Sequence, residues 1–264
     1  MPDVFRPALF AGRTAFVAGG TSGINLAIAQ RFVELGAAVS VVSRSAEKVA
    51  AAVRDLESRG GRASGQAADV REYDAVAAAL RAAHARFGPI DMLVSGAAGN
   101  FVARALDMSA KGFRTVVDID LLGTFNVLRA AHEYLRKPGA AIVNISAPQS
   151  YMPMAGQAHV GAAKAGVDML TRNLAVEWGG DGIRVNSIVP GPIEDTEGMQ
   201  RLGASPTARA KLERHIPLGR YGQKHEIADL ATFLCSDAAR YVTGAVVVCD
   251  GGQSLLGSAG FMPE

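Results

Sequence analysis

A glycine-rich turn between a short apolar run and a helical stretch is the feature that most constrains this chain. Residues 14–18 are apolar and residues 23–35 have the periodicity of a helix. Glycines in such a turn let the backbone approach a pyrophosphate, whose negative charge then meets the N-terminus of the helix. We therefore predict a cofactor-binding turn that includes Gly19, Thr21, Ser22, Gly23 and Ile24. A plain strand–helix turn is the alternative.

Short apolar runs alternate with helical stretches along the rest of the chain. Further strands are expected at residues 39–43, 91–95, 141–145, 184–188 and 246–249, and helices at 45–58, 113–135 and 157–178. In such an alternation the crossovers are right-handed and helices cover both faces of a parallel sheet. We therefore predict the α/β class, with residues 1–264 forming a single Rossmann-type domain, a doubly wound parallel sheet with helices on both faces.

Residues 191–214 interrupt this alternation. The segment is long, contains several Gly and Pro residues and follows the carboxyl end of a strand, where ligands bind in folds of this class. We therefore expect a mobile, lid-like insertion over the site.

The composition limits the partners and the compartment. The chain is 49% hydrophobic with a net charge of +2, so it can build a large core but has no global charge that favours nucleic acid or a membrane surface. Cys235 and Cys249 are too far apart for a CxxC pair, so neither a metal site nor a redox dithiol is expected. No apolar run reaches about 18 residues, and neither end has a targeting signal of the secretory or Ser-Lys-Leu kind. We therefore expect a soluble, cytoplasmic protein with no membrane partner.

The end of the second predicted strand bears on the choice of nicotinamide cofactor. An enzyme that prefers NAD usually has an acidic residue there, which accepts a hydrogen bond from the ribose 2′-hydroxyl. This chain has Ser43 and Arg44 instead, and an arginine can donate two hydrogen bonds to a 2′-phosphate. The pair therefore predicts NADP as the cofactor. The alternative is that Arg44 is a solvated residue at the start of a helix.

Several segments resemble the short-chain dehydrogenase/reductase family over nearly the whole chain. Besides the glycine-rich turn, they are residues 95–99, 159–164 and 190–193. The family's Tyr-x-x-x-Lys signature is incomplete, because Val160 stands at the tyrosine position before Lys164 and Ala147 stands at the serine position. In the family's usual carbonyl chemistry the tyrosine passes a proton to the substrate oxygen. Val160 and Ala147 cannot do so, and turnover of ordinary ketones or alcohols is not expected.

Further segments narrow the resemblance to 2,4-dienoyl-CoA reductases of the peroxisomal type, which also lack the tyrosine. They are residues 97–101, 118–120, 159–164, 174–179 and 190–193. The resemblance implies NADPH-dependent reduction of a 2,4-dienoyl-CoA to an enoyl-CoA, a reaction in which no phenol has to protonate a carbonyl oxygen. A trans-2-enoyl-CoA reductase or another short-chain oxidoreductase is the nearest alternative. A non-catalytic nucleotide-binding protein is an alternative of another class.

The resemblance also assigns cofactor contacts and catalytic roles. The cofactor would contact Asp69, Val70, Ala97, Lys164, Pro190, Gly191 and Ile193, and Asp69 could be a helix cap instead of a cofactor contact or in addition to it. Lys164 would bind the nicotinamide ribose, and Asp168, one helical turn further on, would hold the water that protonates the α-carbon. An ion pair between Asp168 and Arg172 is the alternative.

Two more residues complete the predicted catalytic set. Asp120 occupies the position of the family's helix-kinking Asn and would orient Lys164 or a chain of waters. Gln149 could donate a hydrogen bond to the thioester oxygen, or it could be an ordinary loop residue. His159 is interpreted as a packed histidine in preference to a base near the site.

The resemblance implies an acyl-CoA substrate and a homo-oligomer, with a tetramer expected. Asn100 and Phe101 would border the acyl channel, and Arg201 in the lid could meet a CoA phosphate. Phe101 could equally be a core residue, and Arg201 a plain surface charge. The long helices predicted at residues 113–135 and 157–178 carry apolar residues on more than one face, as helices do when they pack across a two-fold axis.

Overall fold

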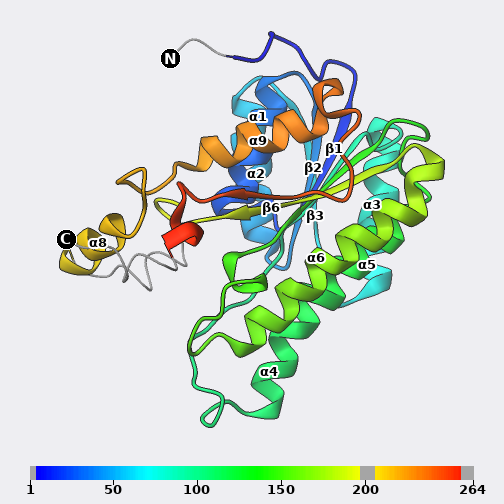
Figure 1. Ribbon diagram of the computed structural model, residues 1–264. Coiled ribbons are helices and arrows are strands. Elements are labelled where there is room, and N and C mark those ends of the chain that lie inside the picture. The colour runs from blue at the N-terminus through cyan, green and yellow to red at the C-terminus, as the bar shows by residue number, and fades with distance from the viewer. Residues whose placement is uncertain (1–3, 197–205, 257–264) are drawn as a thin grey trace.

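The computed structural model describes residues 4–196 and 206–256. In this part of the chain one sheet of seven parallel strands forms the centre of the molecule (Figure 1), in the order β3-β2-β1-β4-β5-β6-β7. The strands are β1 (Thr14–Ala18), β2 (Ala38–Ser43), β3 (Arg62–Ala67), β4 (Met92–Ser95), β5 (Ala141–Ile145), β6 (Arg184–Pro190) and β7 (Val246–Cys249). The strand order reverses between β1 and β4, which is where ligands bind in such sheets. The predicted fold class is confirmed.

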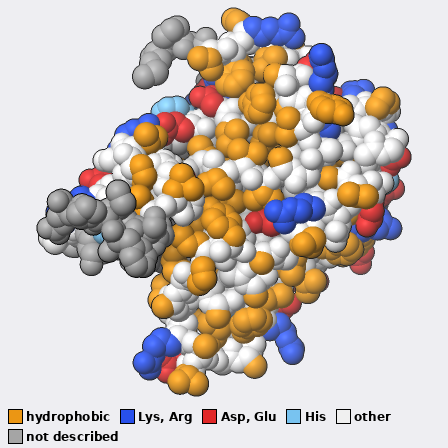
Figure 2. Space-filling model, viewed as in Figure 1, with side chains coloured by type: hydrophobic (Ala, Val, Ile, Leu, Met, Phe, Trp, Pro, Cys, Tyr) orange, Lys and Arg blue, Asp and Glu red, His pale blue; other side chains and the backbone are white. Residues whose placement is uncertain are grey.

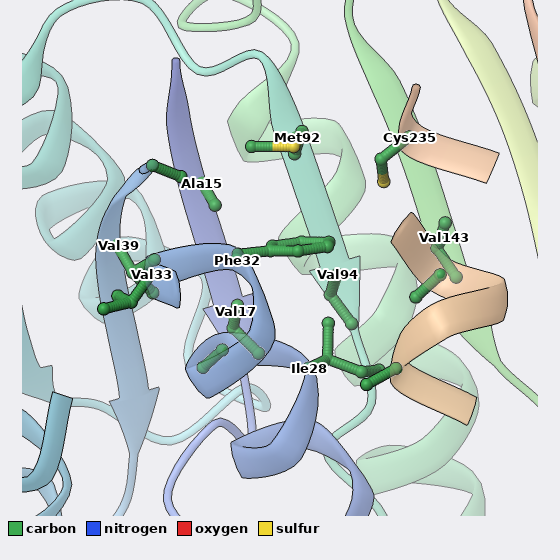
Figure 3. Close-up of a cluster of buried hydrophobic side chains, with 14 of the residues drawn as sticks. Ala15, Val17, Ile28, Phe32, Val33, Val39, Met92, Val94, Val143 and Cys235 are labelled. Atoms are coloured by element: carbon green, nitrogen blue, oxygen red, sulfur yellow. The ribbon is translucent and has the colours of Figure 1, made fainter. Parts of the chain in front are cut away.

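Helices cover both faces of the sheet, and each face has its own hydrophobic core. One layer contains α1 (Gly23–Glu34), α2 (Ala46–Ser58) and α9 (Lys224–Cys235), and the other contains α3 (Tyr73–Phe87), α5 (Gly123–Ala131) and α6 (Ala158–Trp178). Figure 3 shows part of the first core, where Phe32 and Ile28 of α1 lie against strand side chains such as Val94. Because the central strands are buried on both faces, their sequences are continuous apolar runs.

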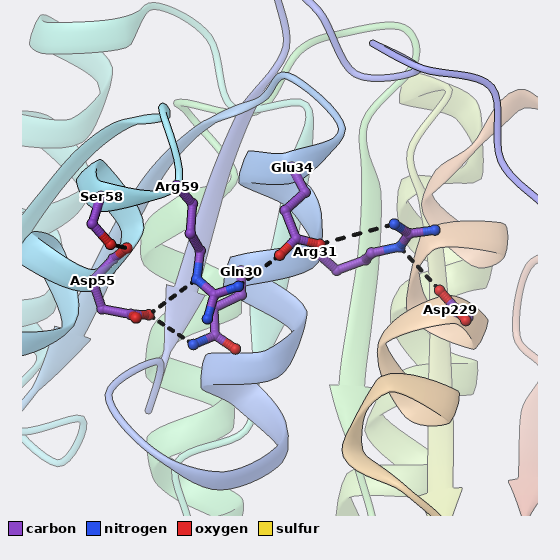
Figure 4. Close-up of polar contacts among 7 residues, drawn as sticks. All are labelled: Gln30, Arg31, Glu34, Asp55, Ser58, Arg59 and Asp229. Atoms are coloured by element: carbon purple, nitrogen blue, oxygen red, sulfur yellow. Dashed lines mark hydrogen bonds and ion pairs between the residues drawn. The ribbon is translucent and has the colours of Figure 1, made fainter. Parts of the chain in front are cut away.

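Ion pairs at the surface hold the first helical layer together (Figure 4). Arg31 of α1 donates to Asp229 of α9 at 3.0 Å, and Arg59 at the end of α2 donates to Glu34 of α1 at 2.7 Å. Exposed pairs of this kind contribute at most about 1 kcal/mol each. They therefore align the three helices, while the core beneath them supplies most of the stability.

The helix predicted at residues 113–135 is divided into three segments, so the prediction of one continuous helix is wrong. α4 (Ala110–Val117) leads into a π-helical turn (Asp118–Leu122), and α5 follows it directly. π-Helical turns often occur at functional sites because the inserted residue redirects a side chain. Here the turn contains Asp120, which is buried. Beyond α5, Leu135 forms a β-bridge with Ile90 instead of extending the helix.

The structure describes only part of the predicted lid. Residues 191–196 and α8 (Pro206–Arg214) are described, whereas residues 197–205 lie outside the described residues. Ile193 forms a β-bridge with Gly222, and Arg209 of α8 pairs with both Glu194 and Glu213. The described parts are thus tied to the body of the domain, and the mobility of the lid stays a prediction. Within the described ranges, no helix is long and apolar enough to cross a membrane.

Candidate active site

A cavity of about 510 Å³ lies where the strand order reverses. The glycine-rich turn after β1, the end of β2 and the turns after β3 and β4 all contribute to its wall. Of the residues predicted from the sequence, it is lined by Gly19, Thr21, Ser22, Ser43, Arg44, Asp69, Val70 and Ala97. Gly23 and Ile24 open α1 directly behind the turn without lining the cavity. Its position and size fit a dinucleotide.

The turn after β1 approaches the turn after β4 so closely that only glycine fits. Gly19 has a φ of +77°, and a Cβ on it would lie 2.9 Å from the backbone nitrogen of Ala97. Asn25 stands where the resembled family usually has the last glycine, and its side-chain Nδ2 donates to the Gly96 carbonyl at 2.8 Å. The two turns are therefore fixed side by side. This arrangement leaves backbone exposed to a phosphate group at the start of α1.

One end of the cavity is basic. Arg44 and Lys48 both line it, and both side chains are exposed. The hydroxyl of Ser43 also faces this end, and it is buried without a hydrogen-bond partner among the described residues. Donors of this kind suit a 2′-phosphate. Lys48 was missed from the sequence: it lies in the first turn of α2, whereas Arg44 precedes the N-cap residue Ser45.

Asp69 also lines the cavity, with its charge already paired. Arg71 donates to it through Nη2 at 2.6 Å, and these side-chain hydrogen bonds lower the pKa of Asp69 against the effect of burial. α3 begins at Tyr73 with Glu72 as its N-cap residue, so the alternative that Asp69 caps this helix is wrong. Its carboxylate instead accepts from the backbone N–H of Arg71 at 3.0 Å.

Lys164 and Asp120 form a buried ion pair. The ammonium Nζ lies 3.4 Å from Asp120 Oδ2 and donates to the Ile145 carbonyl at 2.9 Å, and the two side chains are 6% and 1% exposed. Asp120 Oδ1 accepts from the backbone N–H of Gly99 at 2.7 Å. The predicted pairing of Asp120 with Lys164 is thus present in the structure. Their roles toward cofactor and substrate stay predictions.

Asp168 is buried one turn further along α6. Its Oδ1 accepts a hydrogen bond from the hydroxyl of Ser187 on β6 at 3.1 Å. Arg172 is exposed and makes no ion pair with Asp168 in the described part of the chain, so that alternative is wrong. Ser187 was not predicted, because the contact joins two elements that are far apart in the sequence.

Val160 and Ala147, expected at the tyrosine and serine positions of the resembled family, have aliphatic side chains that cannot donate a proton. Val160 is buried in the first turns of α6, and Ala147 precedes a short 3-10 turn (Pro148–Ser150). Gln149 lies on this turn, where its Nε2 contacts the sulfur of Met154 at 3.7 Å. Its Oε1 is buried without a partner among the described residues. Donation by Gln149 to a thioester oxygen stays a prediction.

The predicted substrate residues lie in the loop after β4. Asn100 is exposed there, and the ring of Phe101 is 36% exposed and packs on His159, so Phe101 is not a core residue. His159 is fully buried, and burial lowers the pKa of its imidazole. It is thus a packed, neutral histidine near neutral pH. Arg201 lies outside the described residues.

Besides Gly23 and Ile24, four predicted cofactor contacts do not line the main cavity. Lys164 lies in the ion pair described above, and Pro190 ends β6. Ile193 contributes to a second, smaller pocket of about 80 Å³. A Cβ on Gly191 would lie 2.5 Å from the Cα of Asp250, so the chain after β6 is packed directly on the end of β7. In the described residues no group of three or more His, Cys, Asp or Glu side chains could hold a metal ion.

A parallel sheet with a dinucleotide-sized cavity at its switch point defines a Rossmann-type nucleotide-binding protein. Residues 18–254 match the family model described as enoyl-(acyl carrier protein) reductase, and the chain belongs to the short-chain dehydrogenase/reductase family. Among solved structures it is similar to a citronellol catabolism dehydrogenase of Pseudomonas aeruginosa, with a TM-score of 0.84 at 37% identity, covering 96% of this chain and 100% of that one.

Curated relatives of similar length carry a more specific name. The chain is 46% identical over 254 residues to a peroxisomal 2,4-dienoyl-CoA reductase of Pongo abelii, and the match covers 96% of this chain and 87% of the relative. It is 40% identical over 246 residues to a probable 2,4-dienoyl-CoA reductase of Bacillus subtilis, and this match covers 92% of this chain and 97% of the relative. The resemblance inferred from the sequence is thus confirmed.

The buried ion pair yields a stability prediction. Replacing Asp120 with Ala leaves the Lys164 ammonium buried without its carboxylate, and loss of one partner of such a pair costs about 3–5 kcal/mol. We expect a loss of this size in the free energy of unfolding, measured by urea denaturation. The matched control is Asp107→Ala, which breaks the exposed pair with Arg104 and should cost no more than about 1 kcal/mol. Equal losses in the two variants would contradict the prediction.

Proposed function

We propose that this protein reduces a 2,4-dienoyl-CoA thioester with NADPH. The observation that carries the proposal is the buried Lys164–Asp120 pair beside residues that cannot donate a proton. Val160, four residues before Lys164 on α6, and Ala147, two residues after Ile145, are aliphatic, which favours a reaction that needs no proton on a carbonyl oxygen. The relatives named 2,4-dienoyl-CoA reductases support the same substrate class.

The residues of the site divide the work of such a reduction between them. The cofactor, when bound, supplies a hydride for the distal carbon of the diene. Lys164, held by Asp120 and by the Ile145 carbonyl, binds the ribose hydroxyls of the cofactor and so orients it. Asp168, held by Ser187, positions the water that delivers a proton to the other carbon. One hydride and one proton together convert the diene to an enoyl thioester.

Turnover with matched substrates tests this proposal. NADPH oxidation, followed by absorbance, should be rapid with a 2,4-dienoyl-CoA and negligible with simple ketones. Lys164→Ala should lower turnover by about 100-fold, because a displacement of about 1 Å at the reacting centre has a cost of that order. Asp168→Asn should slow turnover while NADPH binding is unchanged. Rapid reduction of ketones with no reduction of the dienoyl-CoA would refute the proposal, and NADPH binding without any turnover would favour a non-catalytic protein.

A second candidate substrate is a trans-2-enoyl thioester. The description of the matching family model, enoyl-(acyl carrier protein) reductase, favours it. The same assay separates the two, since the preferred substrate is the one with the higher kcat/KM.

We also propose that NADP is the preferred nicotinamide cofactor. Arg44, Lys48 and the unpartnered hydroxyl of Ser43 support this preference, since all three face the same end of the cavity. The strand β2 ends without an acidic side chain, the residue type that usually accepts a hydrogen bond from the ribose 2′-hydroxyl of NAD.

The cofactor preference predicts a defined pattern of affinities. NADPH should bind more tightly than NADH, and Arg44→Ala and Lys48→Ala should each weaken NADPH binding by about tenfold or more, because a charge-assisted hydrogen bond contributes about 1.5–3 kcal/mol. NADH binding should be nearly unchanged, and Lys111→Ala, on the remote helix α4, serves as the control. Calorimetric titration measures all of these affinities. Equal affinities of the wild type for NADPH and NADH would exclude the preference.

We propose that the protein is a homotetramer whose protomers meet through the layer formed by α4, α5 and α6. Large apolar side chains are exposed on these helices, among them Phe113, Phe125, Met169 and Val176. Hydrophobic side chains cover much of the face that includes α6 and α4 (Figure 2). Pairing with a second copy would bury them. The expected cytoplasmic location stays a prediction, and the relatives named peroxisomal give it no support.

The assembly can be tested by light scattering. At micromolar concentration the wild type should have the mass of a tetramer, and Phe125→Glu with Met169→Glu should yield smaller species, because charged side chains are disfavoured in an apolar interface. Tyr241→Glu, at a fully exposed position outside these helices, should leave the mass unchanged. A monomeric wild type would show that this face is not an interface between copies.

A further inference from the structure

We propose that Asn25 binds the pyrophosphate of the nicotinamide cofactor through the second N–H of its side-chain amide. This proposal rests on the use of such a cofactor in the proposed function, and it is independent of the substrate that the protein reduces. Asn25 is the third residue of α1 and lines the cavity of about 510 Å³, whereas Gly23 and Ile24 before it do not. Its side chain therefore belongs to the cavity wall at the point where the helix begins.

The contacts of the Asn25 amide determine which of its two ends is available to a ligand. Nδ2 donates to the carbonyl of Gly96 at 2.8 Å, so exchanging the nitrogen and the oxygen would place two acceptors against each other. Oδ1 fills the space beside Gly96, since a Cβ built on that glycine would lie 2.2 Å from it. The oxygen is buried without a hydrogen-bond partner in the described part of the chain. The nitrogen is therefore the end that can reach a ligand.

The nitrogen of this amide has one N–H that the protein does not use. A side-chain NH₂ group has two N–H bonds, and the contact with Gly96 takes one of them. Among residues 4–196 and 206–256 the second has no hydrogen-bond acceptor. Nδ2 also lies next to the glycine-rich turn, because a Cβ built on Gly19 would be 3.1 Å from it. Gly19 lines the same cavity, so the unused donor lies where this turn forms the cavity wall.

The surroundings of this donor favour an anion. The helical hydrogen-bond ladder of α1 starts with the backbone N–H of Leu26, which donates to the Ser22 carbonyl at 3.2 Å. The N–H groups of residues 23–25 therefore have no acceptor within the helix, and the helix dipole adds partial positive charge at this end. The first turn contains no acidic residue, and the Ser22 side chain does not cap the helix. No carboxylate of the helix thus competes with a bound anion.

The pyrophosphate is the part of the cofactor that fits this position. Of the anionic groups of NADP, the 2′-phosphate suits the basic end of the cavity formed by Arg44 and Lys48. The pyrophosphate then belongs at the start of α1, where such groups bind in dinucleotide folds. A glycine, which the resembled family usually has in place of Asn25, offers no side-chain donor. The amide of Asn25 therefore adds a hydrogen bond to a charged oxygen that a glycine cannot supply.

The test compares two nucleotides that share the adenosine and differ in their phosphates, each titrated into the full-length protein. ADP carries the pyrophosphate, whereas adenosine 2′-monophosphate carries only the phosphate that belongs at the basic end. Asn25→Ala should weaken the binding of ADP by about tenfold or more, because a hydrogen bond to a charged group contributes an amount of this order. It should leave the affinity for adenosine 2′-monophosphate nearly unchanged. Calorimetry, or displacement of bound NADPH followed by its fluorescence, measures both dissociation constants.

Asn126→Ala is the matched control. The side-chain Nδ2 of Asn126 on α5 also holds a turn of the cavity, since it donates to the carbonyls of Val70 at 3.0 Å and Arg71 at 3.3 Å, but Asn126 does not line the cavity. Its loss loosens a turn without removing a donor from the cavity, so any weakening should be equal for the two nucleotides. Equal weakening by Asn25→Ala would overturn the proposal, because the amide would then act only by holding the turn after β4. Unchanged binding of ADP would overturn it too.

A second variant decides the question if Asn25→Ala does not fold. Asn25→Asp keeps the shape of the side chain, replaces the donor with an acceptor and adds a negative charge beside the expected pyrophosphate. The binding of ADP should therefore be weakened even more than in Asn25→Ala, while adenosine 2′-monophosphate is affected much less. An equal effect on both nucleotides in this variant would contradict the proposal.

Failure of the proposed reaction can be told apart from failure of this contact, because neither nucleotide is turned over. A wild type that binds ADP and NADPH but oxidises no NADPH with a 2,4-dienoyl-CoA contradicts the reductase activity alone. The selective loss of ADP binding in Asn25→Ala would still support the contact in that case. A wild type that binds neither ADP nor NADPH would refute the use of the cofactor and this contact with it.

Discussion

The ion pair between Lys164 and Asp120 joins four parts of the fold that are distant in the sequence. Lys164 lies on α6 and donates to the end of β5, while Asp120 lies in the π-helical turn and accepts from the loop after β4. Removing both charges from water is costly, and the cost is recovered only if each remaining donor and acceptor finds a partner. The turn, the loop and the helix are therefore held to one relative geometry, and the cavity that Ala97, Ala98 and Ile119 line depends on it.

How far the site could be predicted depends on whether a contact is local. Residues of the glycine-rich turn and the pair Ser43–Arg44 line one cavity because they lie at the ends of neighbouring strands, and the carboxyl ends of parallel strands meet at one edge of the sheet. The contact of Asp168 with Ser187 could not be predicted, since it depends on how α6 packs over β6. The same holds for the π-helical turn at Asp120, which the helical periodicity of the sequence concealed.

The boundaries of strands and helices also differ in how well the sequence predicts them. Six of the strands in the described residues were predicted to within about two residues, because runs that are buried on both faces are largely apolar, whereas the polar strand β3 was not predicted. The break between α4 and α5 was not predicted, because both helices and the turn between them have similar composition. Whether a strand is buried follows from the polarity of its own residues. A one-residue insertion in a helix, such as the π-helical turn at Asp118–Leu122, is stabilised by partners that only the complete fold supplies.

The presence of a buried lysine–carboxylate pair also bears on whether the site is reactive. A protein that only bound a nucleotide would be as stable, or more so, with two apolar side chains at these positions, because desolvation of the charges offsets much of their attraction. Such a pair is therefore weak support for a purely structural role. It is well suited to hold a cation at one fixed point. Reduction of a 2,4-dienoyl-CoA is compatible with such a fixed cation, and the role of Asp168 in delivering a proton stays a prediction.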